Sequence, residues 1–147
     1  PVILGGEESG GISFLGHIPE GDGIIMGLLL VEIVAEAGIP LSELVANLLA
    51  DVGPAQYARR DQRLKRPVAK DKMVNTLVSD APKEIGGVKV TEVSTKDGVK
   101  YYLEDNSWLL IRPSGTEPVL RVYAEGSSDE MVAALLAYGE GVADSVK

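Results

Sequence analysis

The sequence has no cysteine, one histidine and one tryptophan among its 147 residues. Without cysteine the chain forms no disulfide and no thiolate metal site, which suits a reducing cytoplasm. The longest apolar stretch, residues 24–35, is interrupted by Gly27 and Glu32. It is also shorter than the roughly 20 residues that a membrane-spanning helix needs. These absences predict a cytoplasmic chain without a membrane segment or a signal peptide.

Basic residues are outnumbered by acidic ones, 14 to 22, so the formal net charge at pH 7 is −8. Such a field disfavours general nucleic-acid binding and requires local cations wherever an anion is bound. Half of the 14 basic residues lie within residues 59–72. We interpret this basic segment as a solvated linker or helix face, with an electropositive wall for an anionic ligand as the alternative. A nucleic-acid site is disfavoured, since one Phe and one Trp offer few stacking platforms.

Hydrophobic periodicity divides the chain into two parts. Helical spacing predicts helices over residues 23–37, 41–51 and 71–79, and a closing helix that Ser127 caps. A period of two predicts four antiparallel strands over residues 88–93, 99–103, 108–112 and 119–125. The sequence therefore predicts an α+β fold: a C-terminal domain of four antiparallel strands with flanking helices, preceded by the strand-helix-helix end of an α/β domain.

Residues 112–118 read Arg-Pro-Ser-Gly-Thr-Glu-Pro between two predicted strands. The Arg112 guanidinium offers a planar fork of donors to phosphate oxygens, and Ser114 and Thr116 add hydroxyl donors. Gly115 lets the backbone approach a ligand closely, and the flanking prolines stiffen the loop. The stretch predicts a phosphate-binding loop, with an ordinary surface turn as the alternative.

A second motif, Gly-Glu-Glu-Ser-Gly-Gly at residues 6–11, follows the predicted strand at residues 2–4. Open α/β sheets bind ligands where strands end. There the Glu7 carboxylate can accept hydrogen bonds from two neighbouring hydroxyls of a sugar, and Ser9 can add a third contact. A solvated glycine turn is the alternative interpretation.

The 112–118 string is similar to the phosphate-binding loop of the α-D-phosphohexomutases, the family that includes phosphoglucomutase and phosphomannomutase. The 6–11 string resembles the sugar-binding loop in the third of that family's four domains. The resemblance implies that residues 1–55 end the third domain, residues 56–67 are a linker, and residues 68–147 form the fourth, phosphate-binding domain. Two sets of substrate-binding residues are implied: Glu7 and Ser9 for sugar hydroxyls, and Arg112, Ser114, Gly115 and Thr116 for the phosphate that does not react.

The resemblance also implies a reaction in which a phosphoserine gives its phosphate to a hexose phosphate, with Mg²⁺ and a hexose 1,6-bisphosphate activator. Such chemistry needs a serine beside a histidine and an aspartate-rich metal loop. Neither string occurs in these residues. We therefore expect no catalytic and no metal-binding residue here, and an inactive C-terminal portion whose partners are a sugar phosphate and the remaining domains. The sequence starts with Pro1 and not with Met, which favours a fragment of a longer protein.

Several alternatives stay open at this point. Gly11 stands where several family members have His, and this variant favours glucose phosphate over glucosamine phosphate as substrate, with mannose phosphate not strongly distinguished. His17 is interpreted as a turn residue, with a ligand contact as the alternative. A stand-alone phosphosugar-binding or regulatory domain competes with the enzyme portion. The apolar helix at residues 24–34 is expected to bury its exposed surface by packing against the C-terminal domain, a second copy of the chain or a separate chain.

Overall fold

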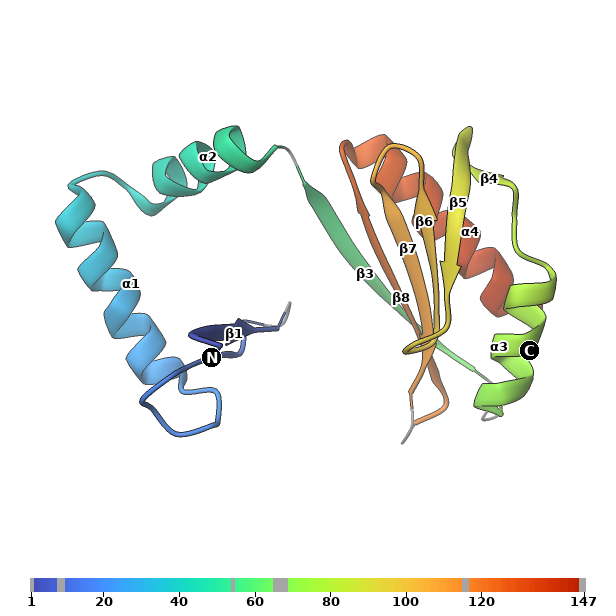
Figure 1. Cartoon of the computed structure of the whole chain (residues 1–147), viewed down its shortest axis with the longest axis horizontal. Helices are drawn as coiled ribbons and strands as arrows, with labels where there is room; N and C mark the ends of the chain where they lie inside the picture. The colour runs from blue at the N-terminus through green and yellow to red at the C-terminus, as the bar shows by residue number, and fades with distance from the viewer. Residues whose placement is uncertain (1, 8–9, 54, 65–68, 115–116, 146–147) are drawn as a thin grey trace. The chain divides into compact units, whose positions relative to one another are not determined.

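The computed structural model describes residues 2–7, 10–53, 55–64, 69–114 and 117–145. The chain divides into two compact units, Pro1–Val52 and Gly53–Lys147. Each unit combines helices with antiparallel strands (Figure 1). The expected α+β class is therefore confirmed.

The first unit begins with a short antiparallel pair, β1 (Leu4–Gly6) and β2 (Ile12–Phe14). Two helices follow, α1 (Gly23–Ala37) and α2 (Leu41–Val52). The sequence predicts both helices but not β2, because three residues are too few to display an alternating pattern.

Helix α1 begins and ends as its flanking residues dictate. The Asp22 carboxylate caps it by accepting hydrogen bonds from the backbone N–H groups of Ile24 and Ile25, at 3.0 and 3.2 Å. Gly38 ends it with a φ of 67°, a left-handed conformation in which a residue without a Cβ is favoured.

Helix α1 also exposes much apolar surface, since Ile24 is 81% and Val31 67% exposed. Its self-association stays a prediction. No single helix in the described part of the chain has the length and apolar character to cross a bilayer, although α1 and α2 taken together across their 82° bend pass that test.

The second unit is built on a six-stranded antiparallel sheet with the order β3-β8-β7-β6-β5-β4. The four predicted strands form its centre. The strands and helices have these bounds: β3 Gln56–Arg63, α3 Lys70–Ser79, β4 Glu84–Ile85, β5 Val88–Ser94, β6 Val99–Leu103, β7 Trp108–Pro113, β8 Val119–Gly126 and α4 Asp129–Ser145.

Strand β3 lies within the segment that the sequence analysis assigned to a linker. All eight of its residues pair with β8, from Gln56 opposite Gly126 to Arg63 opposite Val119. Polar residues occupy both of its faces, so the alternation that marks a half-buried strand is missing. The strand is formed by pairing with the edge of β8 rather than by its own apolar pattern.

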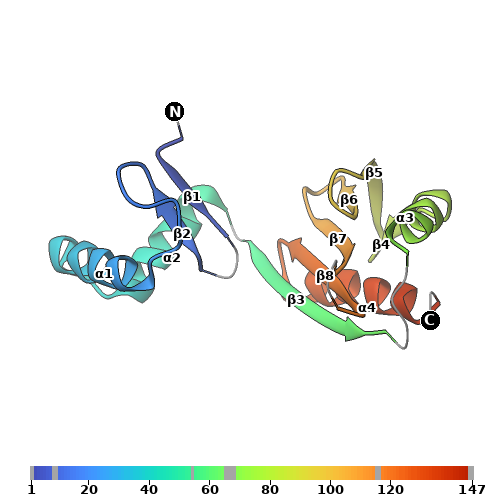
Figure 2. The same cartoon turned by 90° about the horizontal axis from the view of Figure 1, so that it is seen from below.

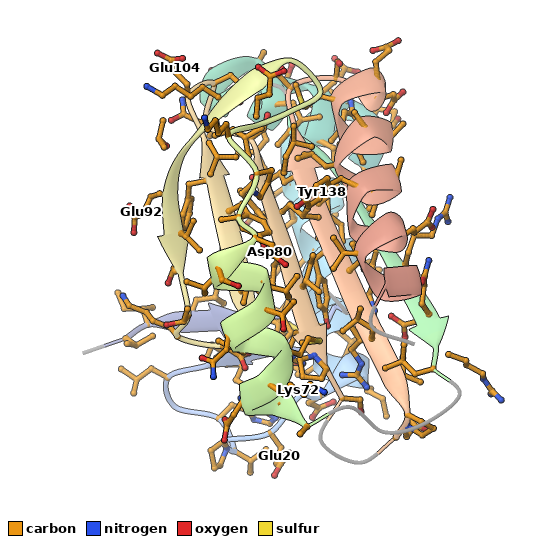
Figure 3. All side chains as sticks on the ribbon, turned by 90° about the vertical axis from the view of Figure 1, so that its right-hand side faces the viewer. Glu20, Lys72, Asp80, Glu92, Glu104 and Tyr138 are labelled. Carbon is orange, nitrogen blue, oxygen red and sulfur yellow. The ribbon has the colours of Figure 1, made fainter. Side chains whose placement is uncertain are left out.

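Helices α3 and α4 lie on the same face of this sheet, and the core fills the space between (Figure 3). Met73 and Leu77 of α3 are buried there, as is Leu135 of α4. The buried Tyr101 hydroxyl donates a hydrogen bond of 2.8 Å to the Leu77 carbonyl, and the Tyr138 ring meets the Tyr101 ring edge-on. Helix α4 is thus held directly against the sheet.

One local prediction was wrong: Ser128, not Ser127, caps α4. The Ser128 hydroxyl accepts a hydrogen bond from the Met131 N–H at 3.3 Å. The capping-box pattern pointed to Ser127 because Glu130 stands three residues after it, whereas the third residue after Ser128 is Met131. The helix begins one residue later than that pattern predicts.

The opposite face of the sheet has no helix over it among the described residues of this unit (Figure 2). The pairing registers place alternate residues of β3, β8 and β7 on it. We call it the open face. It carries charged and aromatic side chains, including Arg112, and is where the candidate phosphate site lies.

Candidate functional site

Arg112 lies near the end of β7, on the open face. Its neighbour in the strand, Ile111, points the other way and is fully buried in the core. The Arg112 Nη1 donates a hydrogen bond of 2.6 Å to Asp97 Oδ2, from the turn between β5 and β6. The Nζ of Lys70, the first residue of α3, lies 3.9 Å from the other oxygen of Asp97. The hydrogen bond to Asp97 raises the pKa of Arg112, so its positive charge is secure.

An aromatic ring lies beneath the cations. The guanidinium carbon of Arg112 is 5.9 Å from the centre of the Tyr123 ring, and that of Arg59 is 5.3 Å from it. Arg59 donates hydrogen bonds from Nε and Nη2 to Asp61, both at 2.7 Å. This contact lowers the pKa of Asp61. Tyr123 therefore stacks beneath two guanidinium groups, an arrangement that favours cations.

A third guanidinium, Arg121 of β8, completes the cluster. It lies directly opposite Arg112 on one side and Asp61 on the other. Its Nε is shielded from solvent and has no hydrogen-bond acceptor among the described residues. Three arginines and one lysine thus outnumber the two carboxylates, Asp61 and Asp97, so the cluster is positive on a chain of net charge −8.

The loop after β7 is closed by hydrogen bonds. The Ser114 N–H donates to the Val119 carbonyl at 2.8 Å, and the Ser114 hydroxyl accepts from the Glu117 N–H at 3.3 Å. Gly115 and Thr116, two predicted phosphate contacts, lie outside the described residues. The structure therefore brings Arg112 and Ser114 to one end of β7.

In the first unit, Glu7 lines a cavity of about 420 Å³. Hydrogen bonds between Glu7 N–H and Gly11 carbonyl, and between Gly10 N–H and Glu7 carbonyl, close its loop. A second carboxylate, Glu20, also lines the cavity. Ser9, the other predicted sugar contact, lies outside the described residues. The volume is within the range of small-molecule sites, and the two carboxylates are acceptors for ligand hydroxyls.

His17 takes a structural position. Its Nε2 lies 3.0 Å from Asp22 Oδ2, and its ring stacks on Phe14 with 5.3 Å between the ring centres. It is not among the described residues that line the cavity. This geometry supports the turn interpretation over the ligand contact.

The described residues contain no group of three or more His, Cys, Asp or Glu side chains that could hold a metal ion. We therefore assign none of them to magnesium.

Sequence reasoning missed five residues of these two sites: Lys70, Asp97, Arg121, Arg59 and Glu20. Arg59 and Lys70 were seen only as members of a basic segment. Asp97 and Arg121 meet Arg112 through strand pairing, so a correct register for β6, β7 and β8 was the signal that would have found them.

Two family models match the chain in sequence order. The model of the phosphoglucomutase/phosphomannomutase alpha/beta/alpha domain III matches residues 1–52, and that of the C-terminal domain of the same proteins matches residues 73–138. The matches leave residues 53–72, which include β3, between them.

Individual curated relatives are also phosphohexose mutases by name. A phosphoglucosamine mutase of Syntrophobacter fumaroxidans is 37% identical over 99% of this chain and 27% of its own length. A phosphoglucomutase/phosphomannomutase of Thermococcus kodakarensis is 34% identical over 92% of this chain and 27% of its own length. The chain thus spans about a quarter of the length of these curated relatives.

Among solved structures, a phosphoglucomutase/phosphomannomutase family protein of Burkholderia thailandensis is similar to the chain, with a TM-score of 0.67 and 26% identity. The match covers 97% of this chain and 28% of that protein.

Proposed function

Because this chain belongs to the phosphoglucomutase/phosphomannomutase family, we propose that it is the substrate-binding C-terminal portion of an enzyme that interconverts hexose 1-phosphates and hexose 6-phosphates. The second unit binds the phosphate that does not react. The first unit binds the sugar.

The observation that carries this proposal is the cation cluster around Arg112. A guanidinium has five N–H donors, so the hydrogen bond from Nη1 to Asp97 leaves donors for a phosphate. Ser114 follows two residues later, where the chain leaves β7. An acidic protein that gathers Arg112, Arg121 and Lys70 at one place has the local charge that phosphate binding needs. Gly115 and Thr116 stay predicted contacts.

The sugar is proposed to bind in the Glu7 cavity. Carboxylates of Glu7 and Glu20 line it, and both accept hydrogen bonds from hydroxyls. Ser9 stays a predicted contact. Contacts to hydroxyls remote from carbon 2 leave glucose and mannose phosphates weakly distinguished.

Glucose phosphate is the substrate that the sequence favours, and glucosamine phosphate is a second candidate. One observation favours the latter: the Syntrophobacter fumaroxidans relative is named a phosphoglucosamine mutase. Comparing glucose 6-phosphate with glucosamine 6-phosphate in binding experiments decides between them.

We propose that the chain binds but does not catalyse by itself. In the parent enzyme Mg²⁺ neutralises charge on the transferred phosphoryl group, and its ligands and the phosphoserine belong to other domains. A coupled assay of the purified chain with glucose 1-phosphate and glucose 1,6-bisphosphate is expected to show no turnover. Turnover would refute the assignment of catalysis to other domains.

A stand-alone phosphosugar-binding domain is the alternative from a different class. Adding the remaining domains of a family member as a separate chain distinguishes the two. Restored mutase activity supports the enzyme portion, and binding without any restored activity supports the alternative. Cytoplasmic localisation stays a prediction.

Calorimetric titration with inorganic phosphate tests the site directly. Arg112→Ala is expected to weaken phosphate binding at least tenfold, since hydrogen bonds to charged groups contribute about 1.5–3 kcal/mol each. Arg60→Ala is the matched control, because Arg60 lies on the helix-covered face of β3, 3.7 Å from Glu140 of α4. Equal affinity in Arg112→Ala and the unaltered chain would refute the proposed phosphate site.

A further inference from the structure

Asp97 joins two cations of the phosphate site, Arg112 and Lys70. One of its oxygens accepts the 2.6 Å hydrogen bond from Arg112 Nη1, and the other lies 3.9 Å from Lys70 Nζ. The three residues come from the β5–β6 turn, the end of β7 and the start of α3. Asp97 is itself 57% exposed and contributes nothing to the core.

The backbone holds Asp97 in this place. The next residue, Gly98, has a φ of 83° and lies so close to β7 that a Cβ there would be 3.0 Å from the Arg112 Cα. Immediately afterwards Val99 pairs with Ile111 in the sheet. The turn that carries Asp97 is therefore pressed against the backbone of Arg112, and the carboxylate reaches the guanidinium from a rigid support.

We propose that Asp97 is a positioning residue of the phosphate site: it orients the Arg112 guanidinium and keeps Lys70 beside it, so that both cations meet the anion together. The proposal rests on the proposed function, because it concerns the same phosphate. Asp97 itself does not touch the ligand.

Two opposite effects of Asp97 must be weighed. Its charge repels a phosphate, so charge alone predicts that removing Asp97 tightens binding. However, Arg112 also lies opposite Arg121, and among the described residues Asp97 is the carboxylate paired with Arg112, so its removal leaves the repulsion from Arg121 and Lys70 without that offset. A long, partly exposed arginine then turns toward solvent and must be ordered again when the ligand binds. Exposed charges are weakly coupled through water, so we infer that the ordering effect is the larger one.

The charge effect and the ordering effect change the phosphate affinity of Asp97 variants in opposite directions, so a binding measurement distinguishes them. In calorimetric titrations of the whole chain with inorganic phosphate, Asp97→Ala and Asp97→Asn are each expected to weaken binding about three- to tenfold. Glu104→Gln is the control for the loss of one negative charge. Glu104 lies at the opposite end of the sheet from Lys72 of α3 (Figure 3), so this variant is expected to leave the phosphate affinity unchanged. Unchanged or tighter binding in the Asp97 variants would overturn the proposal.

A double-mutant cycle shows whether Asp97 acts through Arg112. In an Arg112→Ala background, Asp97→Ala is expected to have no further effect on phosphate affinity. The same loss in both backgrounds would mean that Asp97 acts by another route, and the proposal would fail. If Arg112→Ala alone leaves the affinity unchanged, the proposed function fails instead, so the two failures are distinguishable.

An NMR measurement separates positioning from a structural role. The ¹⁵N order parameter of the Arg112 Nε–H is expected to fall in Asp97→Ala, while the unfolding midpoint stays the same because Asp97 is exposed. A guanidinium as ordered as in the unaltered chain would contradict the positioning role.

Discussion

Arg112 and Arg121 lie directly opposite each other on β7 and β8, although like charges in that position destabilise an antiparallel pair. Carboxylates offset the charge on both flanks, since Asp97 binds Arg112 and Asp61 lies across from Arg121 in β3. An anion placed near both guanidiniums would turn their mutual repulsion into two attractions. The open face is therefore expected to be more stable with an anion bound than without one.

Phosphate is accordingly expected to raise the unfolding temperature of the chain. A ligand that binds only the folded state at 100 times its Kd contributes about 2.7 kcal/mol. Differential scanning calorimetry in phosphate and in chloride of equal ionic strength measures the specific part of this shift. Arg112→Gln is expected to abolish it. The same increase in both salts, or in both proteins, would count against a specific anion site.

The sequence predicted most helices and strands because their signals are local. The predicted range 23–37 matches α1, although the capping role of Asp22 emerged only from the structure. Strands β6, β7 and β8 have apolar residues at every second position on the helix-covered face, as in Leu109 and Ile111 of β7, whereas an irregularity between Val90 and Glu92 interrupts this alternation in β5. Strand β3 has no such signal, because Arg60 on the helix-covered face and Arg59 on the open face are equally polar.

The candidate site was predicted only as far as single motifs allow. Arg112 and Ser114 lie in one short string, so their proximity follows from the sequence. Asp97 is 15 residues from Arg112, and their contact depends on how β6 pairs with β7. Register is determined by the whole sheet, so no short motif reveals the pair.

Tyr101→Phe is expected to destabilise the second unit by about 1–3 kcal/mol, the cost of leaving a buried polar group without its partner. The Tyr101 hydroxyl donates to the Leu77 carbonyl at the end of α3, and Tyr101 is fully buried. Burial also raises the pKa of this hydroxyl, so it remains a donor at neutral pH. Urea unfolding measures the effect. Tyr102→Phe is the control, because Tyr102 is 36% exposed, and an equal loss in both variants would contradict the role of the buried hydrogen bond.

Acid is expected to weaken the start of α1. The hydrogen bond from the Ile25 N–H, followed by the contact with His17, lowers the pKa of Asp22 from its ordinary value of 3.8. Because the folded pKa lies below the unfolded one, the stabilisation is complete above the unfolded value and is lost as the pH falls through the folded value.

Asp22→Asn tests this, since asparagine caps a helix about as well but does not ionise. Circular dichroism from about pH 6 to about pH 2 is expected to show a smaller acid-dependent loss of helix in the variant than in the unaltered chain. Glu104→Gln is the control for the change in charge. Identical acid profiles for Asp22→Asn and the unaltered chain would refute this role of the cap.

Two glycines of α4 are expected to respond to alanine in opposite directions. A Cβ at Gly139 would collide with Val122 Cγ1 in the core, whereas a Cβ at Gly141 meets nothing within 4 Å. Overpacking costs about 1–3 kcal/mol, which exceeds the gain of about 0.5–1 kcal/mol from replacing glycine in a helix. Gly139→Ala should therefore lower the free energy of unfolding in urea and Gly141→Ala should raise it. A stabilising Gly139→Ala would mean that α4 does not lie against β8 at the distance described.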